Sequence, residues 1–199
     1  WSDDSTGTKT IVCTMNKATP TIELSGTSGT VVAGKTINFT ATTKSNASSG
    51  TVTGTLSVTS SQTGKATVAP ASTTVAATNS GVNTVATITG VAGGTSTITV
   101  SFTHSDGNYT TTTSKTYTVT VANSVTIPTA ANYCSTPTYT GASQSIVKTA
   151  GTGFGWSGGN TQTNAGTYTV TATLTSATPP YRWSDDSTGT KTIVCTMNK

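Results

Sequence analysis

The sequence is poor in charge, in helix-forming residues and in histidine, and each shortage excludes a class of protein. Only 8% of its 199 residues are charged, and the ten basic residues are spread along the chain without clustering. Nucleic-acid-binding proteins gather lysine and arginine on one stripe or patch, so the sequence disfavours that class. Its single histidine, His104, offers little material for a hydrolytic triad or a zinc site. We therefore expect no enzyme, no cofactor and no metal.

Long apolar runs and a secretion signal are missing as well. No stretch approaches the roughly 20 apolar residues that cross a bilayer as a helix, and the sequence starts with neither an initiator methionine nor a signal peptide. These absences fit a segment of a processed, secreted protein whose signal and any anchor lie elsewhere. We expect no membrane insertion in this segment.

Threonine dominates what is present, with 54 of the 199 residues. Threonine and valine are β-branched and fit a pleated, half-buried surface. Apolar and polar residues alternate in short runs, which is typical of strands with one buried face. These runs cover residues 36–43, 51–59, 65–69, 82–91, 95–103 and 115–122. The pattern predicts an all-β protein with β-sandwich architecture.

An exact internal repeat organises the chain. The segment WSDDSTGTKTIVCTMNK occupies residues 1–17 and returns, identical at every position, as residues 183–199. Repetition at a fixed period is typical of tandem arrays, which are built for length or for repeated display. We expect the chain to be one full repeat followed by the start of the next.

Three segments, VVAGKTINFTATT, GKATVAP and TITGVAGGTSTITVSF, resemble the bacterial immunoglobulin-like domain of group 2. The resemblance covers residues 18–122 and implies a Greek-key sandwich of about seven strands without catalysis. Such domains are common in cell-surface adhesins and phage structural proteins. Residues 123–130, which contain Pro128, then read as a short, semi-rigid linker.

Residues 131–199 form a second unit with YTGASQS, TNAGTYTVTATLT and YRWSDDSTGTKTIVCTMNK as its recognisable pieces. They resemble a repeat of bacterial surface and phage-associated proteins with a Y-x-G, N-A-G-x-Y and Y-x-W pattern. The resemblance implies a small β domain with a long strand at 167–175, with Tyr181 and Trp183 capping its core. It also implies a closing strand at 191–198 that buries one face, made of Ile193, Cys195 and Met197.

The repeat accounts for an odd number of cysteines. Cys134 opens the second unit and Cys195 lies in its last strand, and the first and last strands of a small sandwich can be neighbours. We therefore predict a Cys134–Cys195 disulfide and an extracellular, oxidising location, on a cell surface or a virion appendage. Cys13 is the duplicate of Cys195, so its partner would be the Cys134 equivalent of a neighbouring repeat or chain. The alternative is three buried free thiols.

Residues 1–17 would be the closing strand of a preceding repeat. A lone strand with Ile11, Cys13 and Met15 on one face cannot bury that face by itself. Either this strand belongs to a continuous array, or it completes the second unit of a neighbouring chain by strand addition. The partners expected are thus neighbouring repeats or copies of the chain itself.

Three functions follow from these features. The first is a structural repeat in a long extracellular fibre or adhesin stalk. The second is a self-assembling filament or phage appendage subunit joined by a shared terminal strand. The third is a carbohydrate-binding module that stacks host or surface glycans on Trp156, the aromatic least explained by the repeat pattern. The run Asp185-Asp186-Ser187 is read as a polar turn, because calcium loops space their ligands more widely.

Overall fold

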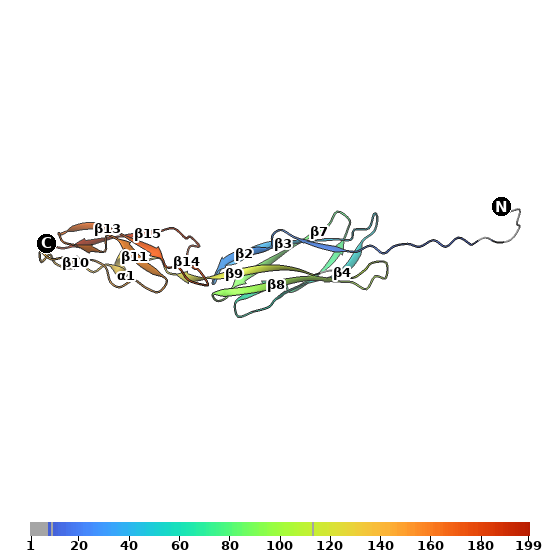
Figure 1. The fold of residues 1–199 in the computed structure, drawn as a ribbon, viewed down its shortest axis with the longest axis horizontal. Coiled ribbons are helices and arrows are strands. Elements are labelled where there is room, and N and C mark those ends of the chain that lie inside the picture. The colour runs from blue at the N-terminus through green and yellow to red at the C-terminus, as the bar shows by residue number, and fades with distance from the viewer. Residues whose placement is uncertain (1–7, 9, 113) are drawn as a thin grey trace.

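The computed structural model describes residues 8, 10–112 and 114–199. Within this part, two β-sandwich domains follow one another along a single long axis (Figure 1). The all-β prediction is confirmed. The chain enters the first domain at one end of the molecule, and Lys199 lies at the other (Figure 1). Residues 1–7 and 9 of the predicted closing strand at 1–17 lie outside the described residues.

The first domain consists of two sheets packed face to face. One sheet has the strand order β1-β3-β7-β5, and the other has the order β9-β8-β4-β6. The short strand β2 runs parallel to β9 on the free edge of β9. The bounds of the nine strands are β1 Thr21–Leu24, β2 Ser28–Val32, β3 Thr36–Lys44, β4 Val52–Ser60, β5 Ala66–Ala69, β6 Ser72–Ala77, β7 Val82–Gly90, β8 Gly94–Thr103 and β9 Lys115–Val125.

Alternation along the strands builds the core between these sheets. In β8, Ile98, Val100 and Phe102 are buried, while Thr99 and Ser101 between them lie on the other face and are half-buried. Phe39 of β3 stacks on Tyr117 of β9 with ring centroids 4.9 Å apart, which ties the two sheets together. All six runs predicted from alternation are strands, because their period of two matches the pleat. Strands β1, β2 and β6 lie outside the six expected runs, and β6 joins the edge beside β4.

The second domain is smaller and has a three-stranded sheet of order β11-β13-β15 and a two-stranded sheet of β10 and β12. The expected long strand and closing strand are β13 and β15, and Ile193, Cys195 and Met197 are buried as predicted. Trp183 is fully buried. The elements are α1 Ala130–Tyr133, β10 Gln144–Ser145, β11 Phe154–Gly158, β12 Thr161–Gln162, β13 Gly166–Leu174, β14 Tyr181–Trp183 and β15 Lys191–Met197.

The expected linker at residues 123–130 differs from what is observed. Strand β9 continues through Val125, and the single helical turn α1 begins at Ala130, so only residues 126–129 lie outside regular structure. The reason is that β14 pairs in parallel with the last three residues of β9, which gives this stretch of backbone a partner. Val119, Val121, Val125 and Ile127 share one parity along the strand. Asn123 interrupts this apolar series, so the sequence alone did not show that the strand continues.

Candidate functional site

The most extensively built feature of the molecule is the boundary between its two domains. One edge of β9 pairs first with β2 of the first domain and then with β14 of the second. The amide of Asn123 donates to the carbonyl of Pro180 at 2.9 Å, and the amide of Ser184 donates to the carbonyl of Val125 at 2.8 Å. A continuous strand therefore passes from one domain into the other with backbone hydrogen bonds on both sides of the boundary.

The side chain of Val125 carries β9 into the core of the second domain. Val125 is 4% exposed and packs in a cluster with Phe154, Ala172 and Trp183. Close approach at Gly153 permits this packing, because a Cβ there would lie 2.6 Å from Val125 and 2.9 Å from the Tyr181 ring. The last residue of β9 is thus a core residue of the neighbouring domain.

A second contact closes the boundary from the first-domain side. Gly93, in the turn between β7 and β8, lies against Asn123 and against Pro179 of the second domain. A Cβ on Gly93 would lie 2.9 Å from the Pro179 ring, so a side chain there would push the two domains apart. Glycine at this position lets the turn reach the second domain.

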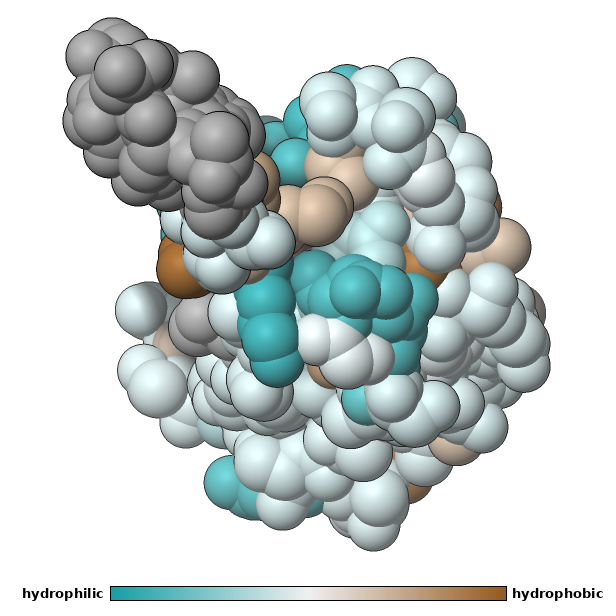
Figure 2. Space-filling view, turned by 90° about the vertical axis from the view of Figure 1, so that its right-hand side faces the viewer, coloured by the Kyte–Doolittle hydropathy of each residue, from teal (hydrophilic) through white to brown (hydrophobic). Residues whose placement is uncertain are grey.

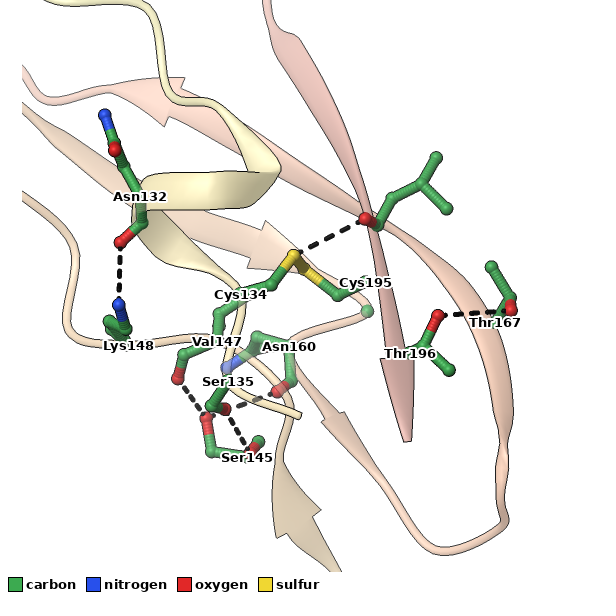
Figure 3. The surroundings of a disulfide bond; sticks show 12 residues. Asn132, Cys134, Ser135, Ser145, Val147, Lys148, Asn160, Thr167, Cys195 and Thr196 are labelled. Atoms are coloured by element: carbon green, nitrogen blue, oxygen red, sulfur yellow. Dashed lines mark hydrogen bonds between the residues drawn. A yellow bond between two sulfur atoms is a disulfide. The ribbon is translucent and has the colours of Figure 1, made fainter. Parts of the chain in front are cut away.

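A disulfide joins Cys134 to Cys195, as predicted, with the two Cα atoms 5.4 Å apart (Figure 3). The strand expected to carry Cys134 is absent, which corrects the geometry of that prediction. Cys134 follows the helical turn α1, and its amide donates to the carbonyl of Ala130 at 2.9 Å. The bond therefore fastens the start of the second domain to its closing strand β15.

Two hydrogen bonds hold the segment that carries Cys134 in place. The Lys148 ammonium donates to the carbonyl of Asn132 at 3.1 Å, as Figure 3 shows. The amide of Ser135 donates to the carbonyl of Ile146 at 3.0 Å. Hydrogen bonds on both sides of Cys134 thus hold its backbone where its sulfur can bond to Cys195 of β15.

The turn between β14 and β15 is a cluster of ion pairs. The Lys191 ammonium contacts the Asp185 carboxylate at 2.5 Å, and Arg182 contacts Asp186 at 2.9 Å. The Lys191 hydrogen bond, helped by the hydroxyl and the amide of Ser187, holds the pKa of Asp185 well below its usual range. Both aspartate carboxylates are therefore paired with basic side chains that flank the same turn, which fits a structural role.

The duplicated segment occurs in two different environments. In its second copy Ile193, Cys195 and Met197 are at most 6% exposed. In its first copy Ile11 is 81% exposed and Met15 is 93% exposed, and Cys13 is an exposed free thiol. Residues 10–17 have no strand assignment, and pairing begins with the bridge between Ala18 and Tyr109.

Trp156, proposed for glycan stacking, is half-buried. Its indole NH donates to the carbonyl of Lys148 at 2.8 Å. The rings of Tyr133 and Phe154 approach it edge-on, with centroids 5.7 and 5.4 Å away. The ring is therefore packed among other aromatic residues, and a stacking role for it stays a prediction.

A hollow of about 760 Å³ lies at the end of the first domain where the chain enters. Figure 2 views this end of the molecule and shows the depression beside the entering segment, with hydrophilic residues gathered in front of it. Its walls are Met15–Ala18, the loop 46–51 and the turn 106–109. The sequence did not point to this hollow, because it is formed by loops that are adjacent only in the fold.

Other kinds of site find little support among the described residues. They contain no cluster of three histidine, cysteine or acidic side chains that could hold a metal ion. His104 is half-buried and its Nε2 lies 3.0 Å from the carbonyl of Thr110. Within the same part of the chain, no helix is long and apolar enough to cross a membrane.

The comparisons with known proteins give local likenesses. No family model matches the sequence, and no curated protein matches it. Domains 4 and 5 of the S-layer protein SbsC align at 26% identity over 50% of this chain and 50% of that one, with a TM-score of 0.36. The match thus spans about half the length of the S-layer fragment.

Two nematode proteins of the MSP class also align with about half of this chain. WR4, an MSP family member of C. elegans, aligns at 13% identity over 51% of this chain and 97% of its own, with a TM-score of 0.40. SSP-19, an MSP-domain-like protein of Caenorhabditis elegans, aligns at 15% identity over 48% and 92%, with a TM-score of 0.34. At these TM-scores the three likenesses define neither a family nor a function for the chain.

Proposed function

We propose that the chain is a structural repeat of a long extracellular fibre or adhesin stalk, which provides length and spacing without catalysis. The observation that carries this proposal is the continuous strand β9, which is hydrogen-bonded in both domains and buries Val125 in the second. A flexible tether would let the domains tumble separately, whereas a paired strand transmits orientation. The chain also enters one end of the long axis and leaves at the other (Figure 1).

One side of the first domain fits a spacer. Hydroxyl residues face one another across the outer surface of the β9-β8-β4-β6 sheet and carry no charge. The pairs are Thr55 with Thr103, Ser57 with Ser101, Thr59 with Thr99, Thr97 with Thr118 and Thr95 with Thr120. An uncharged hydroxyl surface remains hydrated and offers neither an apolar patch nor a charged partner surface.

The disulfide supports an extracellular location. Such bonds persist in secreted and surface proteins and are rare in reducing compartments. The second domain has a thin core for its size, so a covalent link between its first and last segments adds stability where burial supplies little. Under this proposal, the partners of the chain are the neighbouring repeats.

Small-angle X-ray scattering of two chains tests the proposal. One is the present chain, and the other continues Lys199 directly into a second copy of residues 18–199. For a stalk, the maximum dimension nearly doubles while the radius of the cross-section stays constant. A similar maximum dimension with a thicker cross-section would mean that repeats fold back on one another, and the stalk would be rejected.

The filament alternative is favoured by the exposure of Ile11, Cys13 and Met15 in the first copy of the duplicated segment. In that form, residues 10–17 replace β15 of another chain, and Cys13 bonds to its Cys134. Non-reducing electrophoresis of the chain after purification in air distinguishes the two functions. The stalk predicts a monomer with Cys134–Cys195 intact, and the filament predicts a ladder that mass spectrometry assigns to Cys13–Cys134.

A further inference from the structure

We propose that the end of the first domain with the hollow docks directly onto the second domain of the preceding repeat, with Tyr139 of that domain at the contact. This inference rests on the proposed function, in which repeats are covalently continuous. It adds a specific interface between repeats that no part of the single chain contains. The two copies of the duplicated segment each show one side of the same junction.

The second copy shows how the closing end of the second domain is held. The amide of Asn198 donates to the carbonyl of Pro137, and its carbonyl accepts from the amide of Tyr139, both at 2.9 Å. Asn198 also forms a parallel bridge with Thr138. Regular pairing in the second domain therefore extends to Asn198, one residue before Lys199.

The first copy shows how the next domain starts. Ala18 forms a parallel bridge with Tyr109, and its carbonyl accepts from the amide of Thr110 at 2.9 Å. The Thr19 hydroxyl lies 2.7 Å from the Thr110 hydroxyl. Pairing in the first domain therefore begins at Ala18, one residue after Lys17.

Lys17 and Lys199 are the same position of the repeat, so one lysine separates the paired ends of two domains. Successive Cα atoms are about 3.8 Å apart, which limits the distance between Asn198 and the following Ala18 to about 7.6 Å. Side chains on the two facing ends span that distance. The two domains must therefore touch, and a flexible tether between repeats is excluded by chain length.

Tyr139 is the side chain placed to make this contact. It is 48% exposed, and its amide is bonded to Asn198, beside the junction. Across the junction, Tyr109 is bridged to Ala18 and, with the loop 46–51, borders the open hollow at this end of the first domain. The proposed junction therefore brings the end that carries this exposed ring against the end that carries the hollow.

Photo-crosslinking in the two-repeat chain tests this interface. Tyr139 of the first repeat is replaced by p-benzoylphenylalanine, and the second repeat carries Thr63→Ser and Thr95→Ser as mass marks away from the hollow. The marks distinguish the tryptic peptides 45–65 and 66–115 of the second repeat from those of the first. After irradiation, we expect intramolecular crosslinks from position 139 to marked peptides, at residues 46–51 or 106–109.

Two control chains sharpen the result. The same photoreactive residue at Val194, which is 55% exposed on β15, should give no crosslink to the marked peptides. A Gly-Ser-Gly-Ser insertion after Lys199 should lower the yield from position 139 about tenfold, because a longer tether dilutes the facing end. Absence of crosslinks from position 139, or an equal yield with the insertion, would overturn the interface.

The scattering experiment separates this failure from failure of the stalk. A two-repeat chain of doubled length without crosslinks from position 139 keeps the stalk and rejects the interface. A chain without doubled length rejects the stalk, and the interface falls with it.

Discussion

At the scale of single residues, the second domain depends on one covalent bond and one buried indole. Both tryptophans of the described chain, Trp156 and Trp183, lie in this domain, so tryptophan fluorescence reports its unfolding selectively once Trp1→Phe removes the third. Circular dichroism reports the strands of both domains, so a transition that it shows and tryptophan fluorescence does not show belongs to the first domain. These two signals allow each substitution below to be assigned to one domain.

Removing the disulfide should destabilise the second domain alone. Cys134 and Cys195 are 61 positions apart in sequence, and closing a loop of this length stabilises a fold by about 4 kcal/mol in the chain-entropy model. We expect the double variant Cys134→Ser, Cys195→Ser to lose about that much in urea unfolding followed by tryptophan fluorescence. Cys13→Ser is the control and should leave the transition in place; an equal loss there would refute the assignment.

The stability of the second domain should decline in acid through Asp185. Its pKa is lowered in the folded state by Lys191 and Ser187, so the charged carboxylate stabilises the fold above its ordinary pKa of about 4, and this contribution fades as the pH falls below that value. We expect Asp185→Asn to reduce the unfolding midpoint at pH 7 and to converge with the parent chain in acid. If the difference instead grew as the pH fell, the ion pair would not be its source.

For the second domain, the sequence predicted which cysteines pair better than it predicted the structural elements on which they lie. The Cys134–Cys195 pair could be predicted because the repeat identifies Cys13 as a duplicate of Cys195. The helical turn Ala130–Tyr133 that delivers Cys134 could not be foreseen, because four residues are too few for a periodic signal. The half-burial of Trp156 escaped notice for a similar reason, since Tyr133 and Phe154 approach it only in the folded chain.

At the scale of elements, β4 contains a glycine that interrupts its apolar alternation, and the fold explains it. A Cβ at Gly54 would lie 2.7 Å from the Phe102 ring and would also strike the carbonyl of Thr103. We expect Gly54→Ala to destabilise the first domain by about 1–3 kcal/mol, the usual cost of overpacking. Gly64→Ala is the matched control, because nothing lies within 4 Å of its Cβ position; circular dichroism melting compares the two.

Strand β9 belongs to two domains, and a substitution at its end should reveal this. Val125 lies on a strand of the first domain but packs with Trp183 in the second. We expect Val125→Ala to lower the stability reported by tryptophan fluorescence by about 1–3 kcal/mol, as removal of buried methyl groups does. Val85→Ala, on an exposed position of β7, is the control. A Val125→Ala chain with an unchanged fluorescence transition would place the domain boundary elsewhere.

The strands were largely predictable, whereas the partner that lengthens β9 was not. Alternation within β3, β8 and β13 follows from local sequence, because one face of each strand is buried. Pairing between β9 and β14 joins residues that are far apart in sequence, and no local pattern encodes such a contact. For that reason Asn123–Val125 read as linker although this stretch pairs with β14.

At the scale of the whole molecule, a stalk requires that each domain fixes the orientation of the next. Within the repeat, β9 and the contact of Gly93 with Pro179 fix the boundary. Between repeats, a single lysine leaves the facing ends no room to separate. A chain with both kinds of junction should behave as a stiff rod whose length counts its repeats.

Electron microscopy of the native protein tests this claim most directly. We expect straight fibres of constant width with evenly spaced globular beads, two per repeat. Isolated globules, or beads on a freely bending string, would contradict it.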